Sequence, residues 1–149
     1  VYATSENMEG IAVWVESDHA DMTIWRAIRS GSFRSIMKMG MKVGLKMKSI
    51  FEPLEADRKV NMKERVYIYL IIIGIASEFQ GQGFGGKLLG ALIEESERGG
   101  IPIYLETETE RNVSMYERLG FSVLNQITLP VVDLPMWEMV REPKDMIST

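Results

Sequence analysis

Hydrophobic and polar residues alternate with a period of two in several stretches of the chain. The segments 10–16 and 64–75 show this alternation most clearly, which predicts two β-strands. Toward the end of the second segment both alternating sets are apolar, as in a central strand that is covered on both faces. The same extended pattern recurs at 101–107, 121–129 and 136–141. The last two are expected to be antiparallel strands, joined by a loop that holds Pro130 and Pro135.

Apolar residues three or four positions apart predict helices between these strands. The helices lie at 18–30, 32–54, 84–98 and 111–119. Pro53 is expected to end or kink the second helix, which leaves 55–63 as a polar connector or a short helix. Gly100 and Gly120 suit the left-handed backbone that commonly follows a helix. Three acids of the third helix are expected to point to water: Glu94, Glu95 and Glu97.

The composition indicates one domain without cysteine chemistry. The 149 residues are 46% hydrophobic, enough for a sizeable core, and include no cysteine. Disulfides and thiolate metal sites are therefore excluded, and the single histidine, His19, leaves little metal chemistry. The longest apolar run, 66–76, is far shorter than the ~20 residues of a membrane-spanning helix. We therefore predict a cytoplasmic protein with no bound metal, no membrane association and no nucleic-acid partner.

Basic residues are concentrated in one part of the chain. Residues 26–63 carry ten of the seventeen Lys and Arg but only three acids, although the net charge is -4. Met39, Met47 and Met62 lie in the same segment, and this composition fits a surface that touches a membrane or an acidic partner. The interpretation we favour is a methionine-lined pocket wall or core face with solvated lysines.

Residues 80–87 form the most informative stretch, with the sequence Gln-Gly-Gln-Gly-Phe-Gly-Gly-Lys. It lies between an apolar run that ends at Ile75 and a helical pattern that starts near Phe84. Its four glycines leave the backbone N–H groups open to an anion, and the start of a helix favours negative charge. The stretch is therefore predicted to bind a pyrophosphate.

Several known phosphate-binding loops share letters with this stretch. Gly81, Gly83 and Gly86 fit the dinucleotide-binding pattern G-x-G-x-x-G, with Glu106 about twenty residues later, but five residues separate the apolar run from the first glycine. The pattern G-x-x-x-x-G-K also fits, but Leu88 lacks the hydroxyl that would hold Mg²⁺. A kinase-type loop needs downstream catalytic motifs that are missing here. A nucleotide-binding P-loop protein is kept only as a third hypothesis.

The pattern Gln/Arg-x-x-Gly-x-Gly/Ala fits best, with Gln80, Gly83 and Gly85 at its fixed positions. A second block follows at 104–107 (Tyr-Leu-Glu-Thr), 111–112 (Arg-Asn) and 115–121 (Met-Tyr-Glu-Arg-Leu-Gly-Phe). Together they resemble the acetyl-CoA loop and the closing strand, helix and strand of the GNAT superfamily of N-acetyltransferases. In detail they are similar to the branch that contains puromycin N-acetyltransferase. The resemblance spans about residues 10–142 and is strong from Tyr67 onward.

This resemblance implies an α/β (α+β) fold, with a mixed, mostly antiparallel sheet and helices on both faces. GNAT domains normally begin with a strand and two helices that wall the acceptor site, and nothing like them precedes Gly10. We therefore expect a single domain over 1–149 that lacks its first strand and helices. A helical insertion at 18–63 is expected to lie near the acceptor site.

The resemblance also implies where acetyl-CoA binds. In GNAT proteins the strand before the glycine loop splays from its neighbour, and free backbone groups, here of Ile73 and Ile75, pair with the pantetheine arm. Gly74 leaves one face of the strand bare, which suits a close ligand, but for this residue alone we favour tight packing against a helix. The predicted donor-binding residues are Ile73, Gly74, Ile75, Gln80, Gly81, Gln82, Gly83, Phe84, Gly85, Gly86, Asn112 and Tyr116.

Tyr116 is the predicted general acid, because the family places a tyrosine at this point of the helix. A thiolate leaving group has a free pKa near ~8.5 and a phenol one near ~10, so the phenol can donate its proton as charge develops on sulfur. Asn112 lies one turn earlier on the same face. It contacts the donor arm or orders a water near the amine, and it equally suits a helix N-cap.

The general base is less clearly marked in the sequence. Some GNAT members carry a glutamate on the central strand at a position that is Tyr69 here. Glu106, at the end of the next strand, is the first candidate, and the competing interpretation is a solvated or salt-bridged acid. His19 would serve only if the turn after the first strand reaches the site.

These features predict an enzyme that moves an acetyl group from acetyl-CoA to the primary amine of a small molecule by direct attack. The alternative is a CoA-binding or sensory module without efficient turnover, which Tyr69 at the family's acid position favours. The predicted partners are acetyl-CoA, as cosubstrate, and a small amine acceptor. A homodimer is left open.

Overall fold

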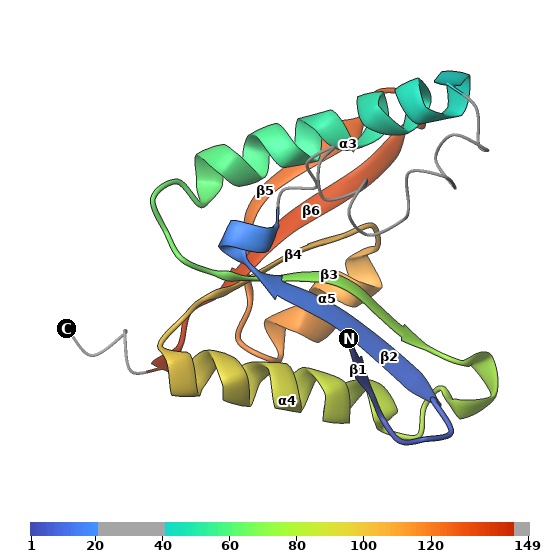
Figure 1. Ribbon diagram of the computed structural model, residues 1–149, viewed down its shortest axis with the longest axis vertical. Coiled ribbons are helices and arrows are strands. Elements are labelled where there is room, and N and C mark those ends of the chain that lie inside the picture. The colour runs from blue at the N-terminus through green and yellow to red at the C-terminus, as the bar shows by residue number, and fades with distance from the viewer. Residues whose placement is uncertain (21–40, 145–149) are drawn as a thin grey trace.

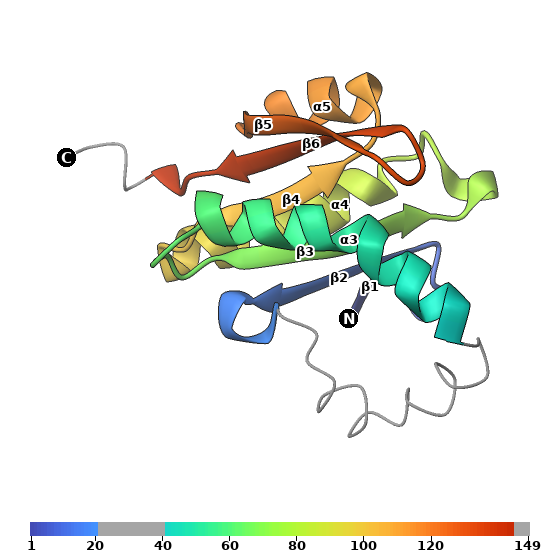
Figure 2. The same ribbon diagram turned by 90° about the horizontal axis from the view of Figure 1, so that it is seen from above.

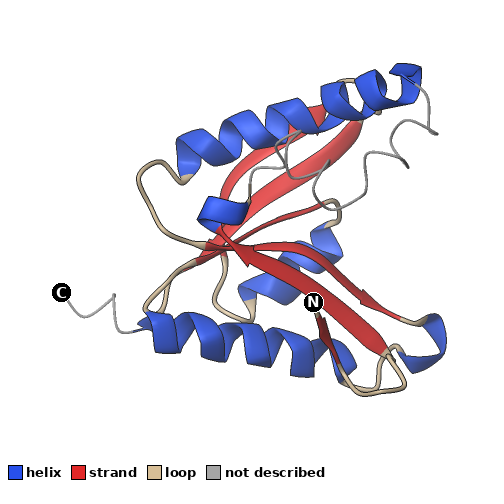
Figure 3. Ribbon diagram, viewed as in Figure 1, coloured by secondary structure: helices blue, strands red, loops and turns tan. Residues whose placement is uncertain are grey.

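The computed structural model of the chain describes residues 1–20 and 41–144 (Figure 1). Its strands are β1 (Tyr2–Ala3), β2 (Gly10–Glu16), β3 (Ile68–Ile75), β4 (Ile103–Thr107), β5 (Ser122–Leu129) and β6 (Leu134–Arg141). Its α-helices are α3 (Met41–Asn61), α4 (Phe84–Gly99) and α5 (Glu110–Glu117). Two single turns of 3₁₀ helix lie at Ser17–His19 and Ser77–Phe79. Figure 3 shows how these helices and strands alternate along the chain.

The strands form one mixed sheet in the order β1-β2-β3-β4-β6-β5. β3 and β4 run parallel, and the other neighbouring strands pair antiparallel. α3 lies over one face of the sheet, and α4 and α5 lie over the other (Figures 1 and 2). The predicted α/β class, with a mostly antiparallel sheet and helices on both faces, is confirmed.

Each face of the sheet carries its own apolar cluster. The larger cluster lies under α4 and α5 and includes Ile68, Leu70, Leu88, Leu92, Ile103, Leu105, Tyr116, Phe121 and Met139. The smaller one lies on the opposite face and consists of Met62, Tyr67, Tyr104 and Val140, with Tyr69 beside it. Consecutive residues of β4 alternate between the two clusters, as the period of a strand requires.

β3 contains one extra residue where it runs along β2. The register passes from Leu70 directly to Ile72, so Ile71 forms a β-bulge. Because a bulge reverses the alternation of faces, Ile73 and Ile75 pack against the same cluster as the inward residues before it. The unbroken alternation that the sequence predicts is therefore wrong beyond Leu70.

β3 also begins later and is less covered than the sequence predicts. Glu64 has a positive φ of 60° in the turn after α3, which no strand residue adopts, and the strand starts at Ile68. Ile71 and Ile72 are 44% and 54% exposed. The prediction of a strand covered on both faces to its end is wrong, because β3 separates from β4 at this point.

α3 continues through Pro53, where the sequence predicts an end or a kink. Leu54, Arg58 and Met62 are buried on the side that faces the sheet. This packing offsets the ~3 kcal/mol that an interior proline costs a helix, so the predicted separate connector at 55–63 is wrong. The predicted helix at 18–30 and the first part of the next one lie outside the described residues. None of the described helices is long and apolar enough to cross a membrane.

The other predicted boundaries are close to those observed, with one exception. α4 ends at Gly100 with φ 62°, and Gly120 has φ 89°, both as predicted. Pro135 lies inside β6 and not in the preceding loop. It stands before the part of β6 that pairs with β4, so its missing N–H group interrupts no hydrogen bond on that side.

The sequence also predicts that Glu95 and Glu97 of α4 point to water, and this prediction is wrong. Trp14 donates from Nε1 to Oε2 of Glu95 at 3.0 Å, and Arg141 donates from Nη2 to Oε1 of Glu97 at 2.5 Å. Arg141 is buried, so its charge requires this partner. The prediction fails because β2 and the end of β6 come to lie beside α4, which local periodicity does not reveal.

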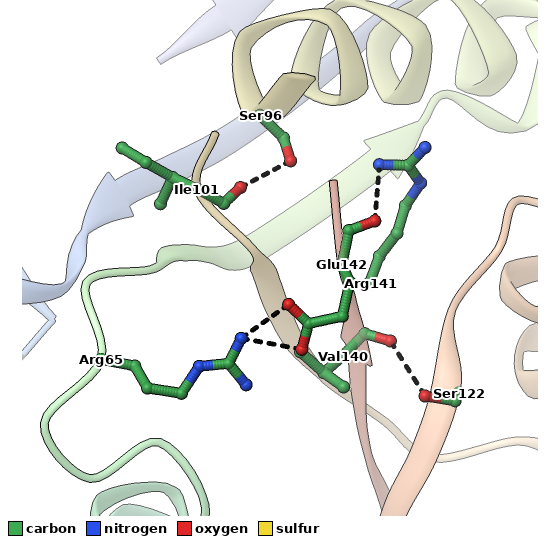
Figure 4. Close-up of polar contacts among 7 residues, drawn as sticks. All are labelled: Arg65, Ser96, Ile101, Ser122, Val140, Arg141 and Glu142. Atoms are coloured by element: carbon green, nitrogen blue, oxygen red, sulfur yellow. Dashed lines mark hydrogen bonds and ion pairs between the residues drawn. The ribbon is translucent and has the colours of Figure 1, made fainter. Parts of the chain in front are cut away.

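Polar contacts also hold the end of β6 to the turn after α3 (Figure 4). Arg65 donates from Nη2 to both carboxylate oxygens of Glu142, at 2.7 and 2.6 Å. Nearby, the hydroxyl of Ser96 donates to the carbonyl of Ile101 at 2.6 Å and closes the connection from α4 to β4. The strands that carry the candidate site are thus fixed at the end away from it.

Candidate active site

β3 and β4 pair over only three residues and then separate. The paired residues run from Ile68 with Ile103 to Leu70 with Leu105. Beyond them β3 pairs only with β2, and Figure 1 shows the two strands diverging. The second half of β3 therefore has one edge without a strand partner among the described residues.

The free edge exposes the main chain of two predicted residues. The N–H of Ala76 donates to the carbonyl of Glu9, so Ala76 faces β2. Because successive residues of a strand direct their main-chain groups to opposite sides, those of Ile75 and Ile73 face away from β2. The side-chain amide of Gln80 donates to the carbonyl of Ile75 at 3.2 Å, which agrees with this direction.

The glycine loop follows this edge and leads into α4. Gly81 and Gly83 have φ values of 76° and 85°, a conformation that glycine adopts without strain. Gly83 is the N-cap of α4 and provides no side chain to bind the first amides of the helix. No described residue accepts a hydrogen bond from the main-chain amides of 81–86. Unpaired amides at the start of a helix are typical of an anion-binding site.

For Gly74, the interpretation favoured from the sequence is tight packing against a helix. A Cβ atom at Gly74 would meet no other atom within 4 Å, so tight packing against a helix is wrong. The bare face at this residue is open. Gly85, by contrast, lies next to Ile75, whose Cγ1 would be 3.7 Å from such an atom.

Tyr116 lies on α5, on the face of the sheet that α4 also covers. Its side chain is buried, and its ring packs edge to face against Phe121 with 5.4 Å between ring centroids. Its hydroxyl makes no hydrogen bond to a described residue. Burial, with a smaller contribution from the charge on Glu108, raises the pKa of Tyr116 to about 12. The phenol is therefore neutral at physiological pH and able to donate a proton.

Asn112 does not cap α5, which settles one of its two predicted roles. Thr109 is the N-cap, and its Oγ1 accepts a hydrogen bond from the backbone N–H of Asn112 at 3.2 Å. The side chain of Asn112 donates instead to Oγ1 of Thr107 at 3.0 Å, at the end of β4. Asn112 therefore ties α5 to the strand that carries Glu106.

This assignment makes a measurable prediction about stability. Thr109→Ala is expected to lower the free energy of unfolding by about 1 kcal/mol, because one N-terminal amide of α5 loses its acceptor. Urea denaturation of Thr109→Ala and Asn112→Ala measures the difference. Equal m-values and a smaller loss for Asn112→Ala are expected, and a larger loss for Asn112→Ala would contradict the capping assignment.

Glu106 is the first residue of β4 beyond the last pair with β3, and it lies on the α3 face of the sheet. The hydroxyl of Tyr69 donates to its Oε2 at 2.6 Å. Arg58 lies over the ring of Tyr69, with its guanidinium carbon 4.5 Å from the ring centroid. Burial raises the pKa of Glu106, and the hydrogen bond from Tyr69 and the charge of Arg58 oppose that rise. Glu106 is thus half-buried and not a freely solvated acid, whereas the interpretation of an acid paired with a cation stays open beside that of the base.

Sequence reasoning missed one acid of this site. Glu138 lies directly opposite Glu106 in the β4–β6 register and has no exposed surface. Asn61 donates from Nδ2 to its Oε2 at 2.6 Å. Burial, and then the charges of Asp57 and Glu106, raise the pKa of Glu138 to about 7. A lone acid inside the apolar run 136–140 was the signal that marked it.

Two other predictions fall outside this geometry. The side chain of His19 lies outside the described residues. Among the described residues, no group of three or more His, Cys, Asp or Glu side chains is placed to hold a metal ion.

Comparison with known proteins assigns the domain to a class. The model of the Acetyltransferase (GNAT) family matches residues 51–121, from within α3 through the glycine loop and α5 to the residue before β5. The chain thus contains an acetyltransferase domain. This domain belongs to the GNAT family, and the predicted resemblance is confirmed at that level. The puromycin N-acetyltransferase branch and the missing N-terminal elements stay predictions.

Two curated relatives and one solved structure illustrate the similarity. An uncharacterized N-acetyltransferase of Schizosaccharomyces pombe is 32% identical over 141 residues, covering 91% of this chain and 57% of the relative. A mycothiol acetyltransferase of Propionibacterium freudenreichii subsp. shermanii is 38% identical over 73 residues, covering 47% of this chain and 22% of the relative. The crystal structure of the NatC complex bound to Gag peptide and CoA is 23% identical, with a TM-score of 0.48, covering 54% of this chain and 53% of that chain. The chain spans little more than half the length of the first relative.

Proposed function

We propose that this domain transfers the acetyl group of acetyl-CoA to a primary amine of a small molecule by direct attack of the amine on the thioester. The observation that carries the proposal is the separation of β3 from β4 immediately before a loop of unpaired glycine amides. An extended pantetheine arm needs a free strand edge, and a diphosphate needs main-chain donors at a helix start. Family membership supports the same assignment.

The donor would be held by main-chain groups. The outward-facing groups of Ile73 and Ile75 are available to the amides of the pantetheine arm, and the open face at Gly74 leaves room beside them. The unpaired amides of 81–86 would receive the diphosphate. Gln80, which now bonds to the carbonyl of Ile75, joins these two parts of the site.

Glu106 would act as general base toward the amine. It stands next to Tyr69, the position at which some GNAT members carry an acid, and so supplies a carboxylate from the neighbouring strand. A base works best when the pKa of its conjugate acid lies near the operating pH, and burial moves the pKa of Glu106 upward in that direction. One proton passes from the ammonium to the carboxylate, and the freed lone pair of nitrogen attacks the carbonyl carbon.

Tyr116 would act as general acid toward sulfur from the opposite face of the sheet. As the C–S bond breaks, its electron pair goes to sulfur and the phenol proton follows it. A phenol with a pKa of about 12 is a weaker acid than a thiol with a pKa near ~8.5, so this transfer alone is uphill by about 5 kcal/mol. After the attack, the nitrogen carries one proton more than the product amide needs. The overall transfer becomes favourable when this proton passes to the tyrosine oxygen and restores the phenol.

A small-molecule acceptor is supported by the two mycothiol acetyltransferases among the relatives, which match this domain at 36% and 38% identity. The alternative acceptor is a peptide N-terminus, since an N-alpha-acetyltransferase 30 of Schizosaccharomyces pombe is 41% identical over 56 residues. Both acceptors present a primary amine, so the chemistry above serves either.

The test combines ligand-linked stability with turnover. Acetyl-CoA at a hundredfold over its Kd is expected to stabilise the protein by ~2.7 kcal/mol, whereas NAD and ATP with Mg²⁺ are not expected to do so. Thiol release from acetyl-CoA is then measured across a panel of small amines and of short peptides. Binding without turnover on either set would favour a CoA-binding module, and turnover on peptides alone would contradict the small-molecule acceptor.

A substitution in the first turn of α4 tests the diphosphate site directly. Gly86→Glu is expected to raise the Kd of acetyl-CoA ~10- to 100-fold, because a carboxylate within several ångströms of the diphosphate costs about 1–3 kcal/mol. A Cβ atom at Gly86 would meet nothing within 4 Å, and an acid at a helix start is favourable, so the protein should stay folded. Isothermal titration calorimetry measures the Kd.

Gly90→Glu is the matched control, one turn further along the same helix. A Cβ atom at Gly90 would also meet nothing within 4 Å. We expect its Kd for acetyl-CoA to stay within ~2-fold of wild type, because the added charge lies one helical turn farther from the loop. Equal weakening by both substitutions would move the diphosphate away from the start of α4.

A further inference from the structure

Two glutamates, one buried (Glu138) and one half-buried (Glu106), lie side by side beneath α3. Glu106 on β4 and Glu138 on β6 are directly opposite each other in the antiparallel register, which places their Cβ atoms ~5 Å apart. Each has one oxygen with a donor: Tyr69 serves Oε2 of Glu106, and Asn61 serves Oε2 of Glu138. In each, the second oxygen, Oε1, is buried and makes no direct hydrogen bond to a described residue. The Tyr104 hydroxyl nevertheless lies near Glu106 and the Asn125 amide near Glu138, and each lowers the pKa of its neighbour.

This arrangement is costly if both carboxylates are ionised. An ionised carboxylate only accepts hydrogen bonds, and a buried acceptor without a donor has lost its hydrogen bonds to water without replacement. One proton on the pair converts one of the unpartnered oxygens into a donor. The hydroxyl of Tyr104, a residue with no exposed surface, is also buried on this face, close to Glu106.

Among the described residues, the charged groups that face the pair do not balance two ionised glutamates. α3 contributes the cation of Arg58 and the anion of Asp57, β3 contributes Tyr69, and β4 contributes Tyr104. The neutral amides of Asn61 on α3 and Asn125 on β5 also face the pair. Within the described residues, two ionised glutamates and Asp57 would face one buried guanidinium, that of Arg58, and an uncompensated buried charge is expensive.

We propose that Glu106 and Glu138 act as a unit that holds one proton between them: the doubly ionised pair, and not Glu106 alone, accepts the proton that the attacking amine releases, and the two carboxylates then share it. This inference rests on the proposed function. In it, Glu106 is the group that meets the substrate and Glu138 is a positioning residue that acts through Glu106. One N–H bond of the ammonium breaks, one O–H bond forms on the pair, and the proton leaves to water after acetyl transfer.

The pair gives Glu106 a base strength that it would not have by itself. Glu138 takes up the shared proton, since burial and neighbouring anions raise its pKa to about 7, whereas Tyr69 and Arg58 oppose the rise at Glu106. The doubly ionised pair therefore becomes available as the pH rises through about 7. The rate constant kcat/KM should rise with it along an acid limb.

The test compares pH profiles of kcat/KM for wild type, Glu138→Gln and Asp57→Asn. Glu138→Gln is expected to move the acid limb down by at least ~1 pH unit and to lower the plateau ~10-fold, because a lone glutamate is a weaker base. Asp57→Asn removes the larger of the two neighbouring charges that raise the pKa of Glu138, so its limb should move in the same direction. A lower rate with an unmoved limb in both variants would overturn the inference.

A second measurement does not depend on turnover. Carbon-13 NMR of the glutamate carboxyl groups, in wild type, Glu106→Gln and Glu138→Gln, follows each titration. Removing either acid is expected to lower the apparent pKa of the other. Independent titrations would overturn the shared proton even if the enzyme is active. Coupled titrations without acetyl transfer to any amine would overturn the proposed function and leave the proton-sharing pair in place.

Discussion

Replacing Glu106 with glutamine is expected to lower kcat for acetyl transfer by ~10²- to 10³-fold and to leave the Kd of acetyl-CoA within ~2-fold of wild type. The amide has nearly the same shape and still accepts the hydrogen bond of Tyr69, but it cannot take up a proton. The loss should therefore appear in turnover and not in binding of the donor. Steady-state kinetics and calorimetry on the same preparation measure the two quantities.

Glu94→Gln is the matched control for this experiment, because Glu94 is an exposed acid on α4 away from the site. Its kcat should stay within ~2-fold of wild type. The rate of Glu106→Gln should also recover partly at high pH, where a larger share of the amine is already neutral. A kcat near that of wild type at neutral pH would exclude Glu106 as the base.

Tyr116→Phe is expected to lower kcat by ~10²-fold, the usual scale of a lost general acid. The phenyl ring keeps the edge-to-face packing on Phe121. Because the hydroxyl bonds to no described residue, the free energy of unfolding should change by less than ~0.5 kcal/mol. Thiol release measures kcat, and urea denaturation measures stability.

Tyr2→Phe serves as the control, since it removes the hydroxyl of an exposed tyrosine on β1. No change in kcat is expected from it. If Tyr116→Phe keeps full activity while its stability is also unchanged, the proton for sulfur comes from another donor. If both activity and stability fall sharply, the hydroxyl has a structural role instead.

The parts of this fold that depend on local chemistry were predictable from the sequence. The start of α4 at the glycine loop, its end at Gly100 and the left-handed Gly120 each follow from residues within a few positions. The free main-chain amides of the loop belong to the same class, since a helix start leaves them unpaired whatever lies around it.

The parts that depend on distant contacts were not predictable. The helix α3 continues through Pro53 because Leu54 and Arg58 are buried on its side facing the sheet, and this packing offsets the cost of the proline. Glu106 has Tyr69 as its donor because two strands far apart in the sequence lie side by side. Glu138 stood out as an acid among apolar neighbours, but its partner on β4 is defined only by the register of the sheet.

The single additional residue at Ile71 changes how the main-chain direction of the following residues must be assigned from the sequence. Deleting the extra residue would remove the bulge and keep Ile72, Ile73 and Gly74 opposite their present partners on β2, so the outward carbonyl and amide groups would stay outward. The pairing with β2, and not the number of residues in β3, therefore determines which main-chain groups face the site. Chains of this family that differ here by a single insertion are therefore comparable only after their strands have been aligned in space.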